Sequence, residues 1–259
     1  RRIEIGFLVV LAHCAPVRRR ASMPEPPFAR HSPVAPASAR PVRGTGVLSR
    51  FRCPAHRPMP ATVVPPTPIE RKLLLGIAIV ALIVSGIAPK DRLTWLLEVI
   101  WVIVAIPVIA LNWRRFPLTR LLSWLLVAHA LVLIHGGAYT YAETPLGFWL
   151  RDTFAALGLD VERNPWDRVG HLMQGFVPAI LARELMLRCT PLQRGGWLFY
   201  LVLAACLSFS AFFELIEWWS ALIYGADADA FLATQGDVWD TQWDMFLCLA
   251  GAVLSLLLW

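Results

Sequence analysis

The chain has 259 residues, of which 57% are hydrophobic, and its mean hydropathy is +0.57. This composition is more apolar than that of a soluble globular domain, so it predicts a polytopic membrane protein. The formal net charge of +6 does not indicate a nucleic-acid partner. The first 68 residues hold eleven arginines and two glutamates, whereas the rest of the chain carries 13 basic and 16 acidic residues.

The first 68 residues differ from the rest of the chain. They hold 13 of the 20 prolines, with arginine, alanine and serine around them and no amphipathic period. Such a segment cannot bury enough apolar surface to offset its chain entropy, so we expect residues 1–68 to be a disordered leader before a membrane domain at 69–259. Because the sequence does not begin with Met and Met59 lies just before the apolar region, we also expect 1–58 to be upstream of the natural start.

Six apolar runs follow the leader. Each is close to the ~20 residues that a helix needs to cross the ~30 Å hydrocarbon core of a bilayer. The predicted fold is therefore all-α, a transmembrane bundle of about six helices at 72–88, 93–111, 118–137, 169–188, 196–223 and 242–259. Between the third and fourth runs, Leu146–Leu157 is apolar at helical spacing. We expect it to lie flat at the membrane interface, either as a lid or as a simple connector.

The distribution of lysine and arginine predicts the orientation. One set of helix ends carries Arg71, Lys72, Arg114, Arg115, Arg120, Arg188 and Arg194, whereas acidic residues dilute the basic ones at the opposite ends. Cytoplasmic loops of membrane proteins are enriched in basic residues. This rule places both termini in the cytoplasm and makes the opposite ends the outer ones.

Most of the intramembrane charge falls at the outer ends of the helices. The polar residues concerned are His135, Glu143, Asp167, His171, Gln174, Glu214, Glu217, Asp237, Asp240 and Asp244. A charged side chain within a transmembrane segment is costly, and such residues are usually retained for a site or for a structural network. The sequence therefore predicts where a site lies but not which reaction occurs there.

Two groups of this set have helical spacing that brings their side chains together. Asp167, His171 and Gln174 fall at i, i+4 and i+7, so the carboxylate can orient the imidazole as a base or metal ligand requires. An N-terminal capping network is the structural alternative. Glu214 and Glu217 fall at i, i+3, and no basic residue follows Gly195. These glutamates need Arg168, His171, a metal ion or protons as partners.

A third group precedes the last apolar run. Asp237, Asp240 and Asp244 would line one face of a helix at i, i+3 and i+7, although acidic residues are also ordinary N-terminal caps. Hard cations prefer oxygen ligands, and added histidines shift the preference towards zinc or iron. We predict a divalent metal held by Glu214, Glu217, His171, Asp240 and Asp244. The predicted catalytic residues are Glu214, Glu217 and His171, with Asp167 orienting the imidazole.

Four segments carry a resemblance to a known family. They are Tyr139–Trp149, Asn164–Gln174, Glu214–Trp219 and Thr234–Met245. With these segments, residues 70–259 resemble the YjdF-type bacterial inner-membrane proteins, a family of predicted membrane proteins of unknown function. The resemblance implies a multi-pass protein of the bacterial inner membrane and no particular activity.

A more distant resemblance is to the VanZ-like proteins, which are associated with teicoplanin resistance. The matching outline consists of Asp167, Arg168 and His171, then Glu214 or Glu217, then Asp240 or Asp244 with Gly251 and Ala252. The second glutamate and the extra aspartates depart from that outline. The resemblance implies a shared site and does not transfer antibiotic resistance.

Three functions fit these features. The first is a metal- or cation-dependent site that acts on, or binds, an envelope lipid or a cell-wall precursor. The second is a transporter coupled to protons or cations, although no inverted repeat or pair of Gly/Pro-broken helices is present in the sequence. The third is a non-catalytic scaffold held together by a polar network. The expected partners are membrane lipids and a small or lipid-linked ligand, and not nucleic acid.

Overall fold

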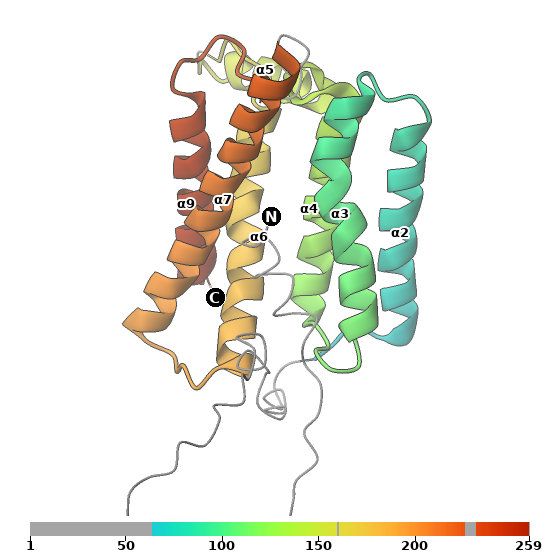
Figure 1. The fold of residues 1–259 in the computed structure, drawn as a ribbon, viewed down its shortest axis with the longest axis vertical. Coiled ribbons are helices and arrows are strands. Elements are labelled where there is room, and N and C mark those ends of the chain that lie inside the picture. Colours follow the sequence, from blue (N-terminus) through green and yellow to red (C-terminus); the bar gives the residue numbers. More distant parts are fainter. Residues whose placement is uncertain (1–63, 160, 226–231, 259) are drawn as a thin grey trace, which may run out of the picture.

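The computed structural model describes residues 64–159, 161–225 and 232–258, and all regular structure in these ranges is helical. Six long helices stand side by side (Figure 1): α2 (Pro68–Ile87), α3 (Arg92–Asn112), α4 (Arg120–Tyr139), α6 (Trp166–Cys189), α7 (Gly196–Tyr224) and α9 (Asp240–Leu258). The all-α prediction is confirmed, and each predicted span matches one of these helices to within a few residues. The predicted disorder concerns residues 1–68, of which residues 1–63 lie outside the described ranges.

Four of the six helices are long and apolar enough to cross a membrane: α3, α4, α7 and α9. The helices α2 and α6 are of similar length, 20 and 24 residues, and run alongside these four (Figure 1). They carry more charged side chains, such as Glu70, Arg71 and Lys72 in the first turns of α2. Membrane crossing by α2 and α6 stays a prediction.

The connection between α4 and α6 lies across one end of the bundle (Figure 1). It contains the short 3-10 helix η2 (Tyr141–Glu143) and α5 (Pro145–Ala156). The α5 side chains of Leu146, Phe148 and Trp149 are exposed, whereas Gly147 is buried. An apolar exposed face is typical of a helix that lies in a membrane interface, as the sequence predicts. We call this end of the bundle the acidic end and the opposite end, with Arg71, Lys72 and Arg114, the basic end.

Polar caps set where several helices begin. Thr67 Oγ1 accepts a hydrogen bond from the Glu70 amide (3.2 Å), and the Glu70 carboxylate accepts one from the Thr67 amide (3.3 Å). At the start of α4, Thr119 Oγ1 accepts a hydrogen bond from the Leu122 amide (3.2 Å). These side chains satisfy amide groups that have no partner within the helix.

The Asp91 cap of α3 predicts a pH dependence of stability. The Thr94 amide donates to the Asp91 carboxylate at 2.6 Å, and this hydrogen bond lowers the pKa of Asp91 below its ordinary value of 3.8. Its contribution is therefore complete above that value and is lost as the pH falls through the lowered pKa. Asparagine caps without titrating. Between about pH 4 and pH 2, we expect the melting temperature to fall less steeply in Asp91→Asn than in the parent, measured by circular dichroism. Parallel pH profiles would contradict this role.

The six long helices form two groups of three. Val99 and Ile134 are central to the core of α2, α3 and α4, whereas Val202 and Ala252 belong to the core of α6, α7 and α9. The groups meet where α4 packs against α6, around the fully buried Leu122. Each group therefore has its own core, and only one pair of helices joins them extensively.

The closest helix packing is between α6 and α9. A Cβ atom added at Gly175 would collide with the backbone carbonyl of Cys248, and one added at Gly251 would collide with that of Leu172. Small residues at such positions let the backbones of membrane helices approach closely. Because the first turns of α6 and α9 carry acidic residues, this contact brings their carboxyl groups together at the acidic end.

Candidate functional site

The loops that enter α6 and α9 are held together by hydrogen bonds between amides. The Asn164 amide donates to Gln235 Oε1 (2.8 Å), and Gln235 Nε2 donates to the Asn164 carbonyl (3.0 Å). The Asn164 side chain also donates to the Thr144 carbonyl (3.0 Å) and accepts from the Trp166 amide (3.0 Å). The beginnings of α5 and α6 and the segment before α9 are therefore fixed relative to one another. They surround the candidate site.

Arg168 in the first turn of α6 binds three aspartates. Its Nη2 donates to Asp237 (2.8 Å) and Asp240 (2.9 Å), and its Nη1 donates to Asp244 (3.0 Å). The guanidinium is mostly buried, with 17% of the Arg168 side chain exposed. From the sequence, Arg168 was one possible partner of Glu214 and Glu217. In the structure it instead binds the three aspartates. Asp237 lies before α9, so only Asp240 and Asp244 share a helix face as predicted.

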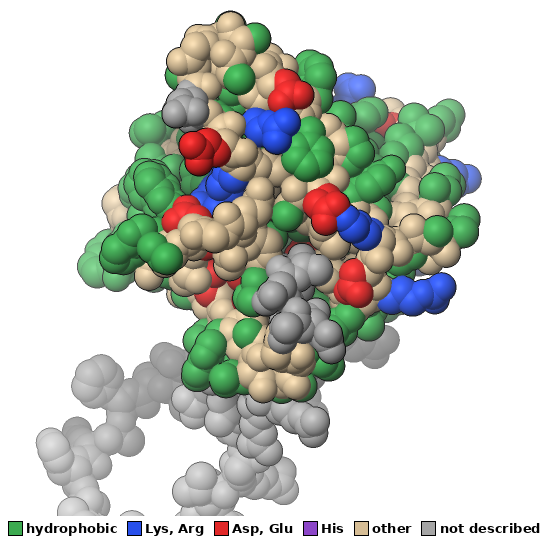
Figure 2. Space-filling model, turned by 90° about the horizontal axis from the view of Figure 1, so that it is seen from above, with side chains coloured by type: hydrophobic (Ala, Val, Ile, Leu, Met, Phe, Trp, Pro, Cys, Tyr) green, Lys and Arg blue, Asp and Glu red, His purple; other side chains and the backbone are tan. Residues whose placement is uncertain are grey.

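Arg163 is the second cation of this network. It binds Asp240, its Nη2 donates to Asp167 (3.2 Å), and the same nitrogen donates to the Ala233 carbonyl (3.2 Å). Asp240 therefore has two guanidinium partners. Its role as a metal ligand stays a prediction, but its geometry is that of an ion-pair residue. Figure 2 looks onto this end and shows acidic and basic side chains next to one another rather than in separate patches.

His171 lies one turn deeper and joins the aspartates of α6 and α9. Its Nε2 is 3.5 Å from Asp167 Oδ1 and 3.8 Å from Asp244 Oδ2, and its Nδ1 is 3.1 Å from Gln174 Oε1. All four side chains are buried. An Nδ1 hydrogen that points at the Gln174 oxygen leaves the Nε2 lone pair directed at the two carboxylates. This arrangement orients an imidazole ligand for a metal.

Asp167, His171 and Asp244 are close enough to hold one metal ion. Their ligand atoms all lie within 4.8 Å of one another. A set of one imidazole and two carboxylates suits zinc, iron or manganese. Without a metal, the same geometry suits an imidazolium bound between two carboxylates. The predicted neighbourhood of Asp167, His171 and Gln174 is thus present, and Asp244 completes it from α9.

The two glutamates of α7 lie beside this set. Glu214 and Glu217 are 7% and 8% exposed. No arginine or lysine among the described residues pairs with Glu214, whose neighbours are the Thr241 hydroxyl and the His171 Nδ1, 4.0 Å from its carboxylate. A buried carboxylate without a full counter-charge is costly, so Glu214 requires either a proton or a cation.

Glu98 and Tyr141 extend the cluster from the other helix group. Both are buried, at 3% and 4% exposed. Burial, together with the nearby Glu98 carboxyl, raises the pKa of Tyr141 well above its ordinary range. The phenol therefore stays protonated and can donate a hydrogen bond to a carboxylate or a ligand.

The cluster as a whole has too few cations for its carboxyl groups. The seven carboxyl side chains are Glu98, Asp167, Glu214, Glu217, Asp237, Asp240 and Asp244. The cations within it are Arg163, Arg168 and, when protonated, His171. Within the described part of the chain, the excess must be neutralised by protons or by a bound cation. This excess of carboxyl groups favours the interpretation of the cluster as a binding site over its interpretation as a purely structural ion-pair network.

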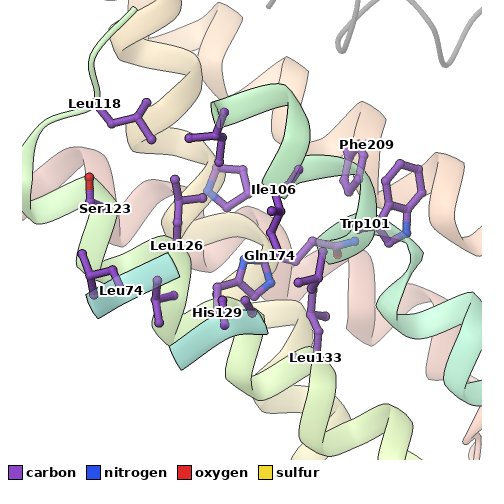
Figure 3. Close-up of a pocket in the computed structure, with 18 of the residues that line it drawn as sticks. Leu74, Trp101, Ile106, Leu118, Ser123, Leu126, His129, Leu133, Gln174 and Phe209 are labelled. Atoms are coloured by element: carbon purple, nitrogen blue, oxygen red, sulfur yellow. The ribbon is translucent and has the colours of Figure 1, made fainter. Parts of the chain in front are cut away.

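A cavity of about 860 Å³ leads from this cluster into the bundle. It lies between the two helix groups, and Figure 3 shows its apolar wall, with Ile106, Leu126 and Leu133 among the lining side chains. His129 points into it, and its Nε2 has no hydrogen-bond partner among the described residues. Ligand pockets commonly have volumes of about 300–1,000 Å³, apolar walls and a few polar groups. No α5 residue lines this cavity, and the lid and connector interpretations of α5 both stay predictions.

The acidic-end polar groups of the cavity come from both helix groups. Glu98 and Tyr141 face it from one side, and Asp167, His171 and Glu217 face it from the other. A ligand in the cavity would therefore contact the cluster directly.

Two polar residues that the sequence placed at the same end lie outside the cluster. His135 packs against the rings of Tyr139 and Trp166, with centroids 5.0 Å away in both cases. Glu143 forms an exposed ion pair with Lys90. Sharing one end of the bundle is therefore not enough to join the cluster, because His135 contacts aromatic rings and Glu143 pairs with a lysine at the surface.

Sequence reasoning missed the contributions of Arg163 and Tyr141. Arg163 lies before the first residue of α6, so helical spacing does not predict its ion pair with Asp167. Tyr141 follows α4 and gave no helical signal. Its neighbour Gly170 indicates a crowded contact, because a Cβ atom there would come within 3.0 Å of the Tyr141 ring.

Comparisons with known proteins agree with the predicted family. The family described as "Predicted membrane protein (DUF2238)" matches residues 71–259. The chain is 46% identical over 176 residues to the inner membrane protein YjdF of Escherichia coli (strain K12), which covers 68% of this chain and 82% of that protein. This similarity supports a location in a bacterial inner membrane. No solved structure matches the chain. The VanZ-like resemblance stays a prediction, whereas the chain belongs to the DUF2238 family of membrane proteins.

Proposed function

We propose that the acidic end holds a divalent metal site that acts on, or binds, an envelope lipid or a cell-wall precursor. Asp167, His171 and Asp244 are the proposed metal ligands. Glu214 and Glu217 complete the site as further ligands or as groups that exchange protons with the bound ligand. In the orientation that the basic residues predict, this site faces the outer side of the inner membrane.

The observation that carries this proposal is the buried set of Asp167, His171 and Asp244, with ligand atoms within 4.8 Å of one another. The Gln174 amide oxygen, 3.1 Å from His171 Nδ1, supports it because metal-binding histidines usually donate their second N–H to such an acceptor. The buried Glu214 carboxylate, which lacks an arginine or lysine partner among the described residues, supports it as well. A divalent metal would neutralise two of the negative charges by which the carboxyl groups of the cluster exceed its cations.

The shape of the cavity suggests how the site is used. Glu217 lines the cavity, whereas Asp244 does not. A metal bound at Asp244 and His171 would lie at the acidic end of this space, beside Glu217. Such a metal can polarise a phosphoryl or carbonyl oxygen of a ligand that enters the cavity. Glu217 is then a further metal ligand on the cavity side, and its carboxylate can also take a proton from that ligand.

The buried glutamates Glu214 and Glu217 favour one alternative, a transporter coupled to protons or cations. Glu214 and Glu217 would take up and release protons instead of holding a metal. The cavity extends from Glu217 at the acidic end to Arg71 at the basic end, as a pathway through the bundle requires.

Elemental analysis of the detergent-purified chain tests the metal site. We expect near-stoichiometric divalent metal in the parent and its loss in His171→Ala and Glu217→Gln, because a missing ligand lowers metal affinity by ~10–100-fold or more. His135→Ala and Glu143→Gln are the matched controls, since both residues lie at the same end but outside the cluster. Both controls should keep the metal.

The opposite result is equally informative. Absence of metal from the folded parent would reject the metal site. Proton uptake by proteoliposomes that depends on Glu214 or Glu217 would then support the transporter. If His171→Ala and Glu217→Gln bind metal as the parent does, the ligands lie elsewhere and the proposed set is wrong.

A further inference from the structure

The cavity reaches the surface of the bundle along the seam between α3 and α7. On this side its lining includes Trp101 and Ala105 of α3 and Ala205, Ser208 and Phe209 of α7. None of these five residues is buried, and Ser208 is exposed. Helix packing joins the two helix groups mainly at α4 and α6, on a different side of the cavity. The α3–α7 seam is therefore the side on which the groups are least tightly joined.

The lipid phase is what lies outside this seam. Both α3 and α7 are long and apolar enough to span the membrane. The small side chains of Ala105 and Ala205 leave space between them, and no charged residue belongs to this part of the lining. A hydrocarbon chain can pass such a seam without losing hydration, whereas a polar solute would lose its hydration shell.

An aromatic contact lies across the seam. The rings of Trp101 and Phe209 meet edge to face, with centroids 5.0 Å apart (Figure 3). The Trp101 indole N–H has no hydrogen-bond partner among the described residues. An aromatic pair of this kind contributes only about 0.5–1.5 kcal/mol beyond its buried area. The seam can therefore open without breaking a hydrogen bond of the indole.

The length and lining of the cavity suit a lipid chain. Glu98 of α3 and Trp113, the C-cap of the same helix, both line it, and at ~1.5 Å per residue they are about 23 Å apart along the helix. This distance is most of the ~30 Å thickness of the hydrocarbon core. The walls between these two residues are apolar, with Ile106 and Leu133 as examples. An elongated apolar chain fits this shape better than a compact solute.

We infer that the ligand of the acidic-end site is a membrane lipid, whose hydrocarbon chain enters between Trp101 and Phe209 and occupies the cavity. This inference rests on the proposed function in that the polar part of the lipid is placed against Glu98, His171 and Glu217. It selects a lipid or lipid-linked molecule over a water-soluble precursor. It also assigns Trp101, Phe209 and Ala205 as the residues that control entry of the hydrocarbon chain into the cavity.

The test is photolabelling of the whole chain in phospholipid vesicles. The probe is a phosphatidylethanolamine with a diazirine at the end of one acyl chain, and mass spectrometry identifies the labelled residues. We expect labels on cavity residues such as Ile106, Leu126 and Leu133 of the parent. Ala205→Trp should lose these labels because the indole fills the seam. Leu207→Trp, on the exposed face of α7 outside the cavity, should keep them.

A second pair of variants tests the route. In the double variant Trp101→Cys with Phe209→Cys, a short bis-methanethiosulfonate cross-linker should bridge the seam and stop labelling, and reduction should restore it. The two single variants should stay labelled after the same treatment. Labels restricted to outer surfaces, or cavity labelling that is unchanged in Ala205→Trp, would overturn the inference.

The two proposals can fail separately. Elemental analysis of the same preparations reports on the metal site without reference to lipid. Metal with no cavity labelling rejects the lipid route and leaves the metal site standing. Cavity labelling without metal rejects the metal site and leaves a lipid-binding cavity.

Discussion

Gly175→Leu is expected to prevent the bundle from assembling. The Cβ atom would collide with the backbone carbonyl of Cys248 and with the Ala252 amide of α9, neither of which can rotate away. Overpacking a core costs about 1–3 kcal/mol when side chains can adjust, and more when backbones must separate. The cost is larger still because the displaced helix carries Asp240 and Asp244. We expect little monodisperse protein after extraction in detergent.

Gly76→Leu is the matched control. Gly76 also lies within a long helix, α2, but a Cβ atom there has no neighbour within 4 Å. We expect its yield and its melting temperature to stay close to those of the parent, as measured by size-exclusion chromatography and thermal unfolding. Gly175→Ala gives an intermediate test, since it adds only the colliding atom. A folded Gly175→Leu protein with the melting temperature of the parent would show that α6 and α9 do not meet as described.

Arg168→Gln should produce the second large loss of stability. The substitution removes the shared partner of Asp237, Asp240 and Asp244 at 2.8–3.0 Å. Breaking a buried ion pair by removing one partner costs about 3–5 kcal/mol, because the remaining charge stays buried. Arg163 still binds Asp240, and 17% of the Arg168 side chain is exposed, so we expect the lower part of this range. The measurement is the melting temperature of the purified protein.

An exposed arginine provides the comparison for this prediction. Arg151 pairs with its neighbour Asp152, whose side chain is 67% exposed, so Arg151→Gln should cost about 0–1 kcal/mol. The melting temperature of Arg168→Lys should lie between those of Arg168→Gln and Arg151→Gln, because one ammonium group cannot reach three carboxylates as a guanidinium does. Equal melting temperatures for Arg168→Gln and Arg151→Gln would mean that the aspartates find other partners.

The helices could be predicted from sequence because the signal is local. A run of about 20 apolar residues has few alternatives to a membrane helix, and side chains such as Asp91 and Thr119 mark the first turns. The neighbourhood of Asp167, His171 and Gln174 follows from helical spacing alone. Residues on the same face of one helix meet whatever the rest of the chain does.

The pairing between helices could not be predicted in the same way. Charge alone allowed Arg168 to pair with Glu214 and Glu217, and the sequence favoured neither glutamates nor aspartates. The choice depends on Gly175 and Gly251, which bring α9 rather than α7 against the start of α6. The cavity could not be predicted from the sequence either, because an internal space results from how whole helices are arranged. Its Trp101–Phe209 contact joins residues that are more than one hundred positions apart.

The division of the charge network between α6 and α9 also determines when the site can form during synthesis. The ribosome releases Arg163 and Arg168 some seventy positions before Asp237, Asp240 and Asp244. During that interval Arg168 has none of the three aspartates that bind it in the folded bundle. Its guanidinium group must stay in contact with water or lipid phosphate until then. The ion-pair network of Arg168 can therefore form only after the segment from Asp237 to Asp244 has been made, so the acidic end is completed late in synthesis.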